Sequence, residues 1–141
     1  MVINIPTKIF FGEEELTNLA NDLKNEKVLV VTGKSKRVLN TDVVKSLINL
    51  FDSNNIQHFV YSNVTTNPTK EQVDLGIKMC KENNCTAIVG IGGGSVIDVA
   101  KAISFSGNND DFWSYVENPR PDNRCFKIIN YKYFCWNWKR N

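Results

Sequence analysis

One stretch of the chain, VGIGGGSVIDVAK at residues 89–101, limits the fold more than any other. An apolar run leads through three glycines and a serine directly into residues with helical spacing. Such a run predicts a strand buried on both faces, and the residues after the glycines predict an amphipathic helix over 96–106. A buried strand that turns at glycines into a helix is typical of α/β proteins, where the turn lies at the carboxyl end of a parallel strand.

Short apolar runs alternate with amphipathic helices along the rest of the chain. Helices are predicted where apolar residues recur at i, i+3 and i+4, and strands where apolar residues stand together in short runs. In chain order these segments are a helix over 13–24, a strand over 27–31, a helix over 42–51, a strand over about 56–61, a helix from Thr69 and a strand over 87–91. The order predicts an α/β fold of the doubly wound class, with a parallel sheet covered by helices.

Two helix starts and one glycine carry further predictions. Either Asn40 or Thr41 is expected to cap the helix over 42–51, and Thr69 and Gln72 have the spacing of a capping box. Gly76 lies within the helix that Thr69 opens, where a glycine costs about 0.5–1 kcal/mol relative to alanine. We therefore expect Gly76 to mark close packing between this helix and a neighbour.

Composition and charge exclude several classes of protein. With 42% hydrophobic and 23% charged residues among 141, the chain has the composition of one soluble globular domain. No apolar run reaches the roughly 18 residues that cross a membrane, and the N-terminus lacks the pattern of a secretory signal, so we expect a cytoplasmic protein with no membrane partner. Apart from the three cations of the last eleven residues, 14 basic residues stand against 15 acidic ones, a balance that does not predict binding to nucleic acid.

Side chains that bind transition metals are few. A cytoplasmic location predicts reduced thiols for the four cysteines, which are Cys80, Cys85, Cys125 and Cys135. His58 is the only histidine, and we expect it to be structural or at the surface. A transition-metal site needs three or four ligands, and the sequence shows no such cluster, so no metal site is predicted in this chain.

The segment from Gly92 to Ser95 has the features of an anion-binding turn. Glycines without a Cβ atom let a ligand approach the backbone closely, and the unpaired N–H groups and dipole of the helix start favour a pyrophosphate. Ser95 can cap the helix or donate its hydroxyl to a phosphate oxygen. The alternative is a glycine-rich turn without a ligand. Asp98 and Lys101 lie on the polar face of the same helix, where their spacing also fits a solvated ion pair.

The sequence GIGGGSVIDVAKAI resembles the signature of the iron-containing (group III) alcohol dehydrogenases, relatives of glycerol dehydrogenase and dehydroquinate synthase. The likeness covers about residues 5–118 and includes PTKIFFGEEELTNL, VLVVTGKSKR and NPTKEQV. It implies a Rossmann-like, dehydroquinate synthase-like N-terminal domain, which in the family precedes a helical domain that holds Fe²⁺ or Zn²⁺ on one Asp and three His. It also implies that Gly93, Gly94 and Ser95 hold the pyrophosphate, that Asp98 lies near the nicotinamide, and that Asn67 lines the coenzyme cleft.

The residues after the first central strand bear on the choice of coenzyme. An acidic residue at this place would bond the ribose 2′-hydroxyl and repel a 2′-phosphate. The chain instead has Gly33, Lys34 and Ser35, followed by Lys36 and Arg37. We therefore predict NADP(H) in preference to NAD(H); an ordinary basic loop is the alternative.

The last eleven residues depart from the resemblance. Where the family continues with a loop of the form INTTAGTGSE, this chain reads YKYFCWNWKRN, in which five of eleven residues are aromatic. Reading the codons one base later forces glycine at Trp136 and Trp138, because each TGG precedes a codon that begins with A. The shifted frame permits INTSAGTGSE, provided that Arg140 is encoded by CGA. We interpret residues 131–141 as an out-of-frame tail, produced by a frameshift, and residues 1–130 as an incomplete dinucleotide-binding domain.

This interpretation implies that the helical metal-binding domain is absent, so the chain as written is expected to be inactive. In a full-length enzyme, hydride would pass between NADP(H) and a small alcohol or aldehyde. A glycerol-dehydrogenase-type substrate and a homo-oligomeric state stay open. Two other functions fit parts of the sequence: a non-catalytic dinucleotide-binding module that ends at Asn141, and a tail whose aromatic and basic residues stack on single-stranded nucleic acid. The tail also fits an ordinary edge strand.

Overall fold

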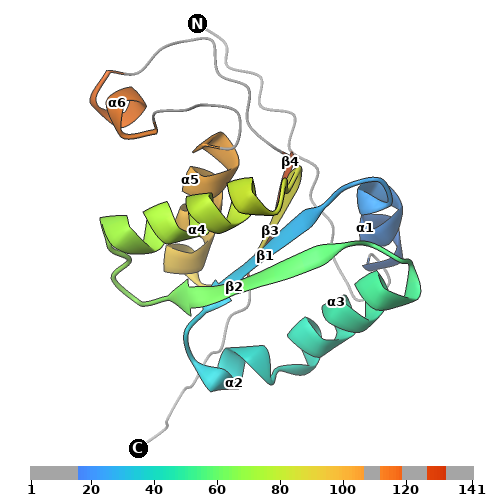
Figure 1. Cartoon of the computed structure of the whole chain (residues 1–141). Coiled ribbons are helices and arrows are strands. Elements are labelled where there is room, and N and C mark those ends of the chain that lie inside the picture. Colours follow the sequence, from blue (N-terminus) through green and yellow to red (C-terminus); the bar gives the residue numbers. More distant parts are fainter. Residues whose placement is uncertain (1–15, 107–111, 119–126, 133–141) are drawn as a thin grey trace, which may run out of the picture.

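A parallel sheet lies at the centre of the computed structural model, which describes residues 16–106, 112–118 and 127–132 (Figure 1). Within these residues the strands are β1 (Val28–Gly33), β2 (His58–Val64), β3 (Ala87–Gly92) and β4 (Lys127–Lys132). They lie in the order β2-β1-β3-β4, and each neighbouring pair is parallel. The side chains of β1 and β3 are almost completely buried, as their continuous apolar runs predict.

Helices cover both faces of this sheet. Their bounds are α1 (Leu16–Leu23), α2 (Lys36–Leu39), α3 (Asp42–Ser53), α4 (Lys70–Glu82), α5 (Gly94–Ser106) and α6 (Phe112–Glu117). Figure 1 shows α1 and α3 on one side of the sheet and α4 and α5 on the other. Val28 and Val30 of β1 pack with α1 and α3, whereas Leu29 and Val31 pack with α4 and α5. The predicted doubly wound α/β fold is confirmed.

Several boundaries differ from the predicted ones. α5 begins at Gly94 rather than at residue 96, and β2 spans His58–Val64 rather than about 56–61. The strand is displaced because Ile56 belongs to the turn after α3. The short helices α2 and α6 were not predicted, since four and six residues are too few for a helical periodicity to show. The predicted helix over 13–24 begins outside the described residues.

α3 and α4 each begin at a threonine and end in a Schellman motif. Thr41 caps α3 by accepting a hydrogen bond from the backbone N of Val44 at 3.4 Å, so Thr41 rather than Asn40 is the N-cap. Beyond the end of α3, Asn55 has a φ of 54°, and Ile56 donates its N–H to the carbonyl of Phe51 at 2.9 Å. An asparagine thus takes the left-handed position that glycine usually occupies in this motif.

Gly76 marks a close approach between α4 and α5, as predicted. A Cβ atom at this position would collide with Cδ1 of Ile103 in α5 and would lie 3.2 Å from Cε1 of Tyr61 in β2. Ile103 is completely buried, so its side chain has little room to move away. The missing side chain therefore sets the spacing of the two helices on this face of the sheet.

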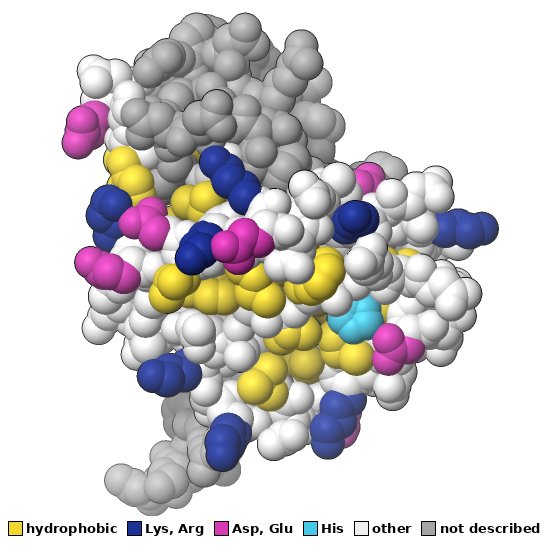
Figure 2. Space-filling view, viewed as in Figure 1, with side chains coloured by type: hydrophobic (Ala, Val, Ile, Leu, Met, Phe, Trp, Pro, Cys, Tyr) yellow, Lys and Arg dark blue, Asp and Glu magenta, His cyan; other side chains and the backbone are white. Residues whose placement is uncertain are grey.

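The face viewed in Figure 2 shows hydrophobic side chains gathered over the region of β2 and α4. Val60 of β2 is 37% exposed and Leu75 of α4 is 53% exposed. β2 is an edge of the sheet among the described strands, which leaves one side of it without a neighbouring strand. His58, its first residue, is half-buried with its ring 5.5 Å from that of Phe51, a structural position as predicted. Among the described residues, no helix has the length and apolar character needed to cross a membrane.

Candidate functional site

The candidate site lies at the carboxyl edge of the sheet, between β1 and β3. β1 leads through α2 to α3 on one face, whereas β3 leads to α5 on the opposite face. The pairing of these two strands ends with Thr32 opposite Ile91, which brings Gly33 beside Gly92. The chain thus leaves two neighbouring strands in opposite directions. Open α/β sheets bind ligands at such a switch point, just beyond the strand ends.

The three glycines after β3 have different surroundings. Gly92 is buried with a φ of 158°, and a Cβ atom there would lie 2.7 Å from Cγ2 of Val96. Gly93 and Gly94 are exposed, and a Cβ atom at either would meet no atom within 4 Å. Gly92 therefore allows α5 to pack onto the end of the strand, while Gly93 and Gly94 present bare backbone to open space that a ligand can occupy.

The first turn of α5 offers hydrogen-bond donors to this space. Gly93 is the N-cap, because its carbonyl accepts a hydrogen bond from the backbone N of Ile97 at 3.1 Å. The N–H groups of Gly94, Ser95 and Val96 precede the first turn of helical hydrogen bonds and have no partner within the helix. Together with the positive end of the helix dipole they favour an anion. Bare glycines and donors in this arrangement fit the pyrophosphate of a dinucleotide.

Ser95 joins the start of α5 to the loop after β2. Its Oγ donates a hydrogen bond to the carbonyl oxygen of Thr66 at 2.5 Å. Of the two roles expected for Ser95, the capping of α5 is wrong, because the helix begins at Gly94, two residues earlier than expected, and Gly93 takes the capping place. Donation from Ser95 to a phosphate oxygen stays a prediction, and it would require the hydroxyl to leave Thr66. The observed bond brings Asn67, the next residue of the loop, beside the glycine turn.

The side chain of Gln72 fixes the loop that carries Asn67. Its Oε1 accepts a hydrogen bond from the backbone N of Thr65 at 3.3 Å, and its Nε2 donates to Oγ1 of Thr65 at 3.1 Å. Oγ1 of Thr65 donates in turn to the carbonyl of Asn67 at 3.1 Å. Thr69 caps α4 by accepting from the backbone N of Gln72 at 3.4 Å, as predicted. In a full capping box the Gln72 side chain would bond the backbone N of Thr69 in return. Here it bonds Thr65 instead, and this bond holds the loop of the candidate site.

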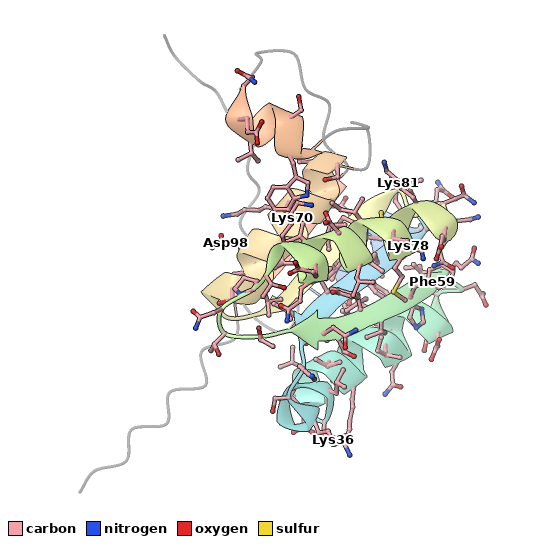
Figure 3. The ribbon with its side chains drawn as sticks, turned by 60° about the vertical axis from the view of Figure 1, so that its left-hand side comes forward. Lys36, Phe59, Lys70, Lys78, Lys81 and Asp98 are labelled. Carbon is pink, nitrogen blue, oxygen red and sulfur yellow. The ribbon has the colours of Figure 1, made fainter. Side chains whose placement is uncertain are left out.

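The loop after β1 completes the site on its other side. The backbone N of Lys34 donates to the carbonyl of Val64 at 2.8 Å, which joins the ends of β1 and β2. Gly33 is half-buried, whereas Lys34 and Ser35 are exposed. Lys36 projects from α2 beyond them (Figure 3). The structure therefore brings together the loops after three strands, and with them the predicted site residues of all three.

Asp98 lies further along α5, where it projects from the helix (Figure 3). Its Oδ1 is 3.6 Å from Nζ of Lys101, and the two side chains are 73% and 61% exposed. This is the solvated i, i+3 ion pair that the spacing allows, a contact of small energetic value. A role for Asp98 near a nicotinamide stays a prediction.

A polar network fastens α6 to the start of α4. Nε1 of Trp113 donates to Oδ1 of Asp74 at 2.7 Å, and Nζ of Lys70 donates to Oδ2 of the same carboxylate at 2.7 Å. The Lys70 ammonium also lies 4.9 Å from the centre of the Trp113 ring. The hydrogen bond from Lys70, and after it the one from Trp113, lower the pKa of Asp74. Both donors favour the charged carboxylate, so the network is expected to persist at neutral pH.

Thr66 and Gln72 are site residues that sequence reasoning missed. Thr66 contributes a backbone carbonyl, which carries no signal in the sequence, and Gln72 was recognised only as a capping residue. In the described part of the chain, no group of three or more His, Cys, Asp or Glu residues is placed to hold a metal ion. The glycine turn and the loops beside it therefore fit a dinucleotide. The described residues do not fit the Fe²⁺ or Zn²⁺ that the resemblance associates with the family.

A parallel sheet with a bare-glycine turn at its switch point defines a Rossmann-like α/β domain. The chain belongs to the iron-containing alcohol dehydrogenase family, because residues 6–130 match the sequence model of that family.

Three relatives illustrate the relationship. The chain is 35% identical over 103 residues to NADH-dependent butanol dehydrogenase B of Clostridium acetobutylicum, a match that covers 72% of this chain and 26% of that protein. It is 36% identical over 110 residues to alcohol dehydrogenase 4 of Saccharomyces cerevisiae, with 74% and 28% covered. Its structure matches an iron-containing alcohol dehydrogenase of Thermotoga maritima with a TM-score of 0.80 at 25% identity, over 93% of this chain and 37% of that one. The chain thus spans between 26% and 37% of the length of these relatives.

Proposed function

We propose that the chain is the coenzyme-binding part of a metal-dependent alcohol dehydrogenase and that its site binds a nicotinamide dinucleotide. The observation that carries this proposal is the pair of exposed glycines, Gly93 and Gly94, at the start of α5 and beside the end of β1. The pyrophosphate would lie on the N–H groups of the first turn, as anions do at helix starts. The loop that carries Asn67 would border it on one side and Gly33–Ser35 on the other.

The bound coenzyme supplies hydride exchange with a small alcohol or aldehyde. The residues of this chain bind the coenzyme and orient it, and the ligands of Fe²⁺ or Zn²⁺ would come from the helical domain of a full-length enzyme. Asp98 would lie toward the nicotinamide end. The cytoplasmic location, the homo-oligomeric state and the choice between a simple alcohol and a glycerol-like substrate stay predictions.

Within this function, we propose NADP(H) as the preferred coenzyme. The support is the end of β1, where a half-buried Gly33 is followed by the exposed Lys34. A carboxylate at this place would repel a 2′-phosphate, and these two residues have none. The two relatives from Clostridium acetobutylicum are named NADH-dependent. The proposed preference for NADP(H) therefore differs from what their names would suggest for this chain.

The direct test is a titration of the full chain with NADPH and with NADH, in which calorimetry measures the affinity for each. We expect the wild type to bind NADPH more tightly than NADH. Lys34→Ala is expected to lower the affinity for NADPH about tenfold, because a charge-assisted contact to phosphate is worth about 1.5 kcal/mol. The affinity for NADH is expected to stay nearly the same. Lys24→Ala is the matched control, because Lys24 is also exposed but follows α1 at the opposite edge of the sheet. No affinity for either coenzyme would refute the proposed function. An equal loss for both coenzymes in Lys34→Ala would refute only the preference.

The out-of-frame origin of residues 131–141 also stays a proposal. Tyr131 and Lys132 are the last residues of β4 and pair with Ile91 and Gly92, so the proposed boundary at residue 130 falls inside β4, which is an edge strand among the described strands. The rest of the segment lies outside the described residues. Sequencing the DNA from codon 125 onward tests the proposal: a shifted frame that encodes the INTSAGTGSE loop, followed by one Asp and three His, would support it. We expect the 141-residue chain alone to show no alcohol oxidation, and measurable oxidation would contradict that expectation.

A further inference from the structure

Two cysteines occupy the paired positions of the Schellman motif that ends α4. Asn84 has a φ of 52°, and Cys85 donates its backbone N–H to the carbonyl of Cys80 at 2.9 Å. The side chains at these two positions usually contact each other as an apolar pair. In α3 the same positions hold Phe51 and Ile56, which are both buried in one cluster. In α4 the pair consists of two thiols.

The geometry of this pair suits a disulfide. A backbone hydrogen bond of 2.9 Å limits the separation of the two Cα atoms to about 6.8 Å, which is within the range that disulfides span. Both cysteines are free, and they are buried in the same hydrophobic cluster at 1% and 2% exposure. Their thiols lie close enough for each to shift the pKa of the other. The two sulfur atoms are therefore neighbours already in the reduced protein.

The environment makes the two thiols unequal. The hydrogen bond with Cys80 lowers the pKa of Cys85, and the nearby Lys27 ammonium lowers it further, against the opposing effect of burial. The same hydrogen bond raises the pKa of Cys80. Cys85 is thus the better nucleophile of the pair, and Cys80 is placed to react second.

We propose that Cys80 and Cys85 form an oxidisable dithiol that closes an intramolecular disulfide, with a small disulfide such as oxidised glutathione as the oxidant. The Cys85 thiolate attacks one sulfur of the oxidant and releases one glutathione thiolate, which leaves a mixed disulfide. Cys80 then loses its proton and attacks the Cys85 sulfur, which breaks the mixed disulfide and releases the second glutathione. Two protein thiols become one disulfide, and the oxidant is reduced to two thiols.

Access to the buried pair comes from the end of the helix. Lys81, Glu82 and Asn84, which lie between the cysteines, are all exposed, and Figure 3 shows Lys81 at this end of α4. Helix ends open locally at a low free-energy cost compared with the core of a sheet. The pair also lies next to the start of β3, at the opposite edge of the sheet from the glycine turn. Oxidation is therefore expected to leave coenzyme affinity unchanged, and a failure of either proposal would not affect the other.

The test exposes the native full chain, in a Cys125→Ser, Cys135→Ser background, to oxidised glutathione and maps the disulfides by mass spectrometry of non-reduced peptides. We expect loss of both free thiols and a bond between Cys80 and Cys85. The single variant Cys80→Ser is expected to stop at the mixed disulfide and to retain one glutathione on Cys85. A displaced control, Cys85→Ala with Thr86→Cys, keeps two thiols but moves one to the exposed neighbouring position, and it is expected to acquire glutathione without closing a bond.

Three outcomes would overturn the proposal. The first is a wild-type protein that retains both thiols under native conditions and loses them only when unfolded. The second is a wild-type protein that accumulates glutathione on Cys85 without closure. The third is a displaced control that closes a bond as fast as the wild type, because closure would then not depend on the helix-end geometry.

Discussion

Alanine substitutions at Gly92 and Gly94 are predicted to separate folding from coenzyme binding. At Gly94 a Cβ atom meets no protein atom within 4 Å, and alanine is a better helix former than glycine by roughly 1 kcal/mol. We therefore expect Gly94→Ala to be as stable as the wild type or slightly more stable. The same Cβ atom would occupy the space proposed for the pyrophosphate. Loss of one hydrogen bond to a charged group costs about 1.5–3 kcal/mol, so the coenzyme is expected to bind roughly 10- to 150-fold more weakly.

Gly92→Ala is the matched comparison and has the opposite expectation for stability. The new Cβ atom would lie 2.7 Å from Cγ2 and 2.9 Å from Cβ of Val96. The backbone φ of 158° at this position is also one that residues with a Cβ atom rarely adopt. Overpacking of this kind costs about 1–3 kcal/mol. Urea unfolding followed by circular dichroism measures the stability of both variants, and calorimetry with NADPH measures affinity. If Gly94→Ala binds NADPH as tightly as the wild type, the pyrophosphate does not lie over the start of α5. If Gly92→Ala unfolds at the wild-type urea concentration, the assignment of Gly92 as a packing residue is wrong.

Two further predictions concern the packing of α4. Gly76→Ala is expected to destabilise the protein by about 1–3 kcal/mol, because the new Cβ atom would collide with the buried Ile103 side chain; an unchanged urea midpoint would contradict this. The pKa of Asp74 is lowered by the hydrogen bonds from Lys70 and Trp113, so its contribution to stability should be present above the ordinary value of 3.8 and should disappear as the pH falls below it. Because Asp74 is 43% exposed, we expect a loss below about 1 kcal/mol, measured as the difference between wild type and Asp74→Asn in urea unfolding from pH 6 to pH 2.5. An equal slope in both proteins over this range would exclude the proposed contribution.

The main architecture could be predicted because its signals are local and repeated. The apolar runs of β1 and β3 are buried on both faces, and each predicted helix presents one apolar stripe, so pattern alone indicated the doubly wound class. The boundaries were less predictable where the ending residue gives a weak signal. α3 runs to Ser53 because Asn54 and Asn55 end it, and asparagine signals the end of a helix less clearly than glycine.

The candidate site was predictable in its residue types and less so in its connections. The loops after three strands were each identified from the sequence, and the parallel sheet places them at one edge. Ser95 was expected to cap its own helix or to donate to a phosphate oxygen, whereas it donates to the backbone carbonyl of Thr66, which is 29 residues away. The three glycines looked equivalent in the sequence, yet Gly92 is buried against Val96 and Gly94 is open. Distinctions of this kind depend on which atoms meet in space, and no sequence spacing encodes them.

The absent side chain at Gly76 has a mechanical consequence for the candidate site. α4 and α5 both start at that site, and they touch further along their lengths, where Gly76 meets Ile103. Because the two helices are rigid and in contact, a movement of one is expected to move the other. A shift of the loop before α4 is therefore expected to shift the start of α5 as well. The relative position of these two segments is thereby expected to depend on a contact inside the protein, which the added methyl group of Gly76→Ala would disturb.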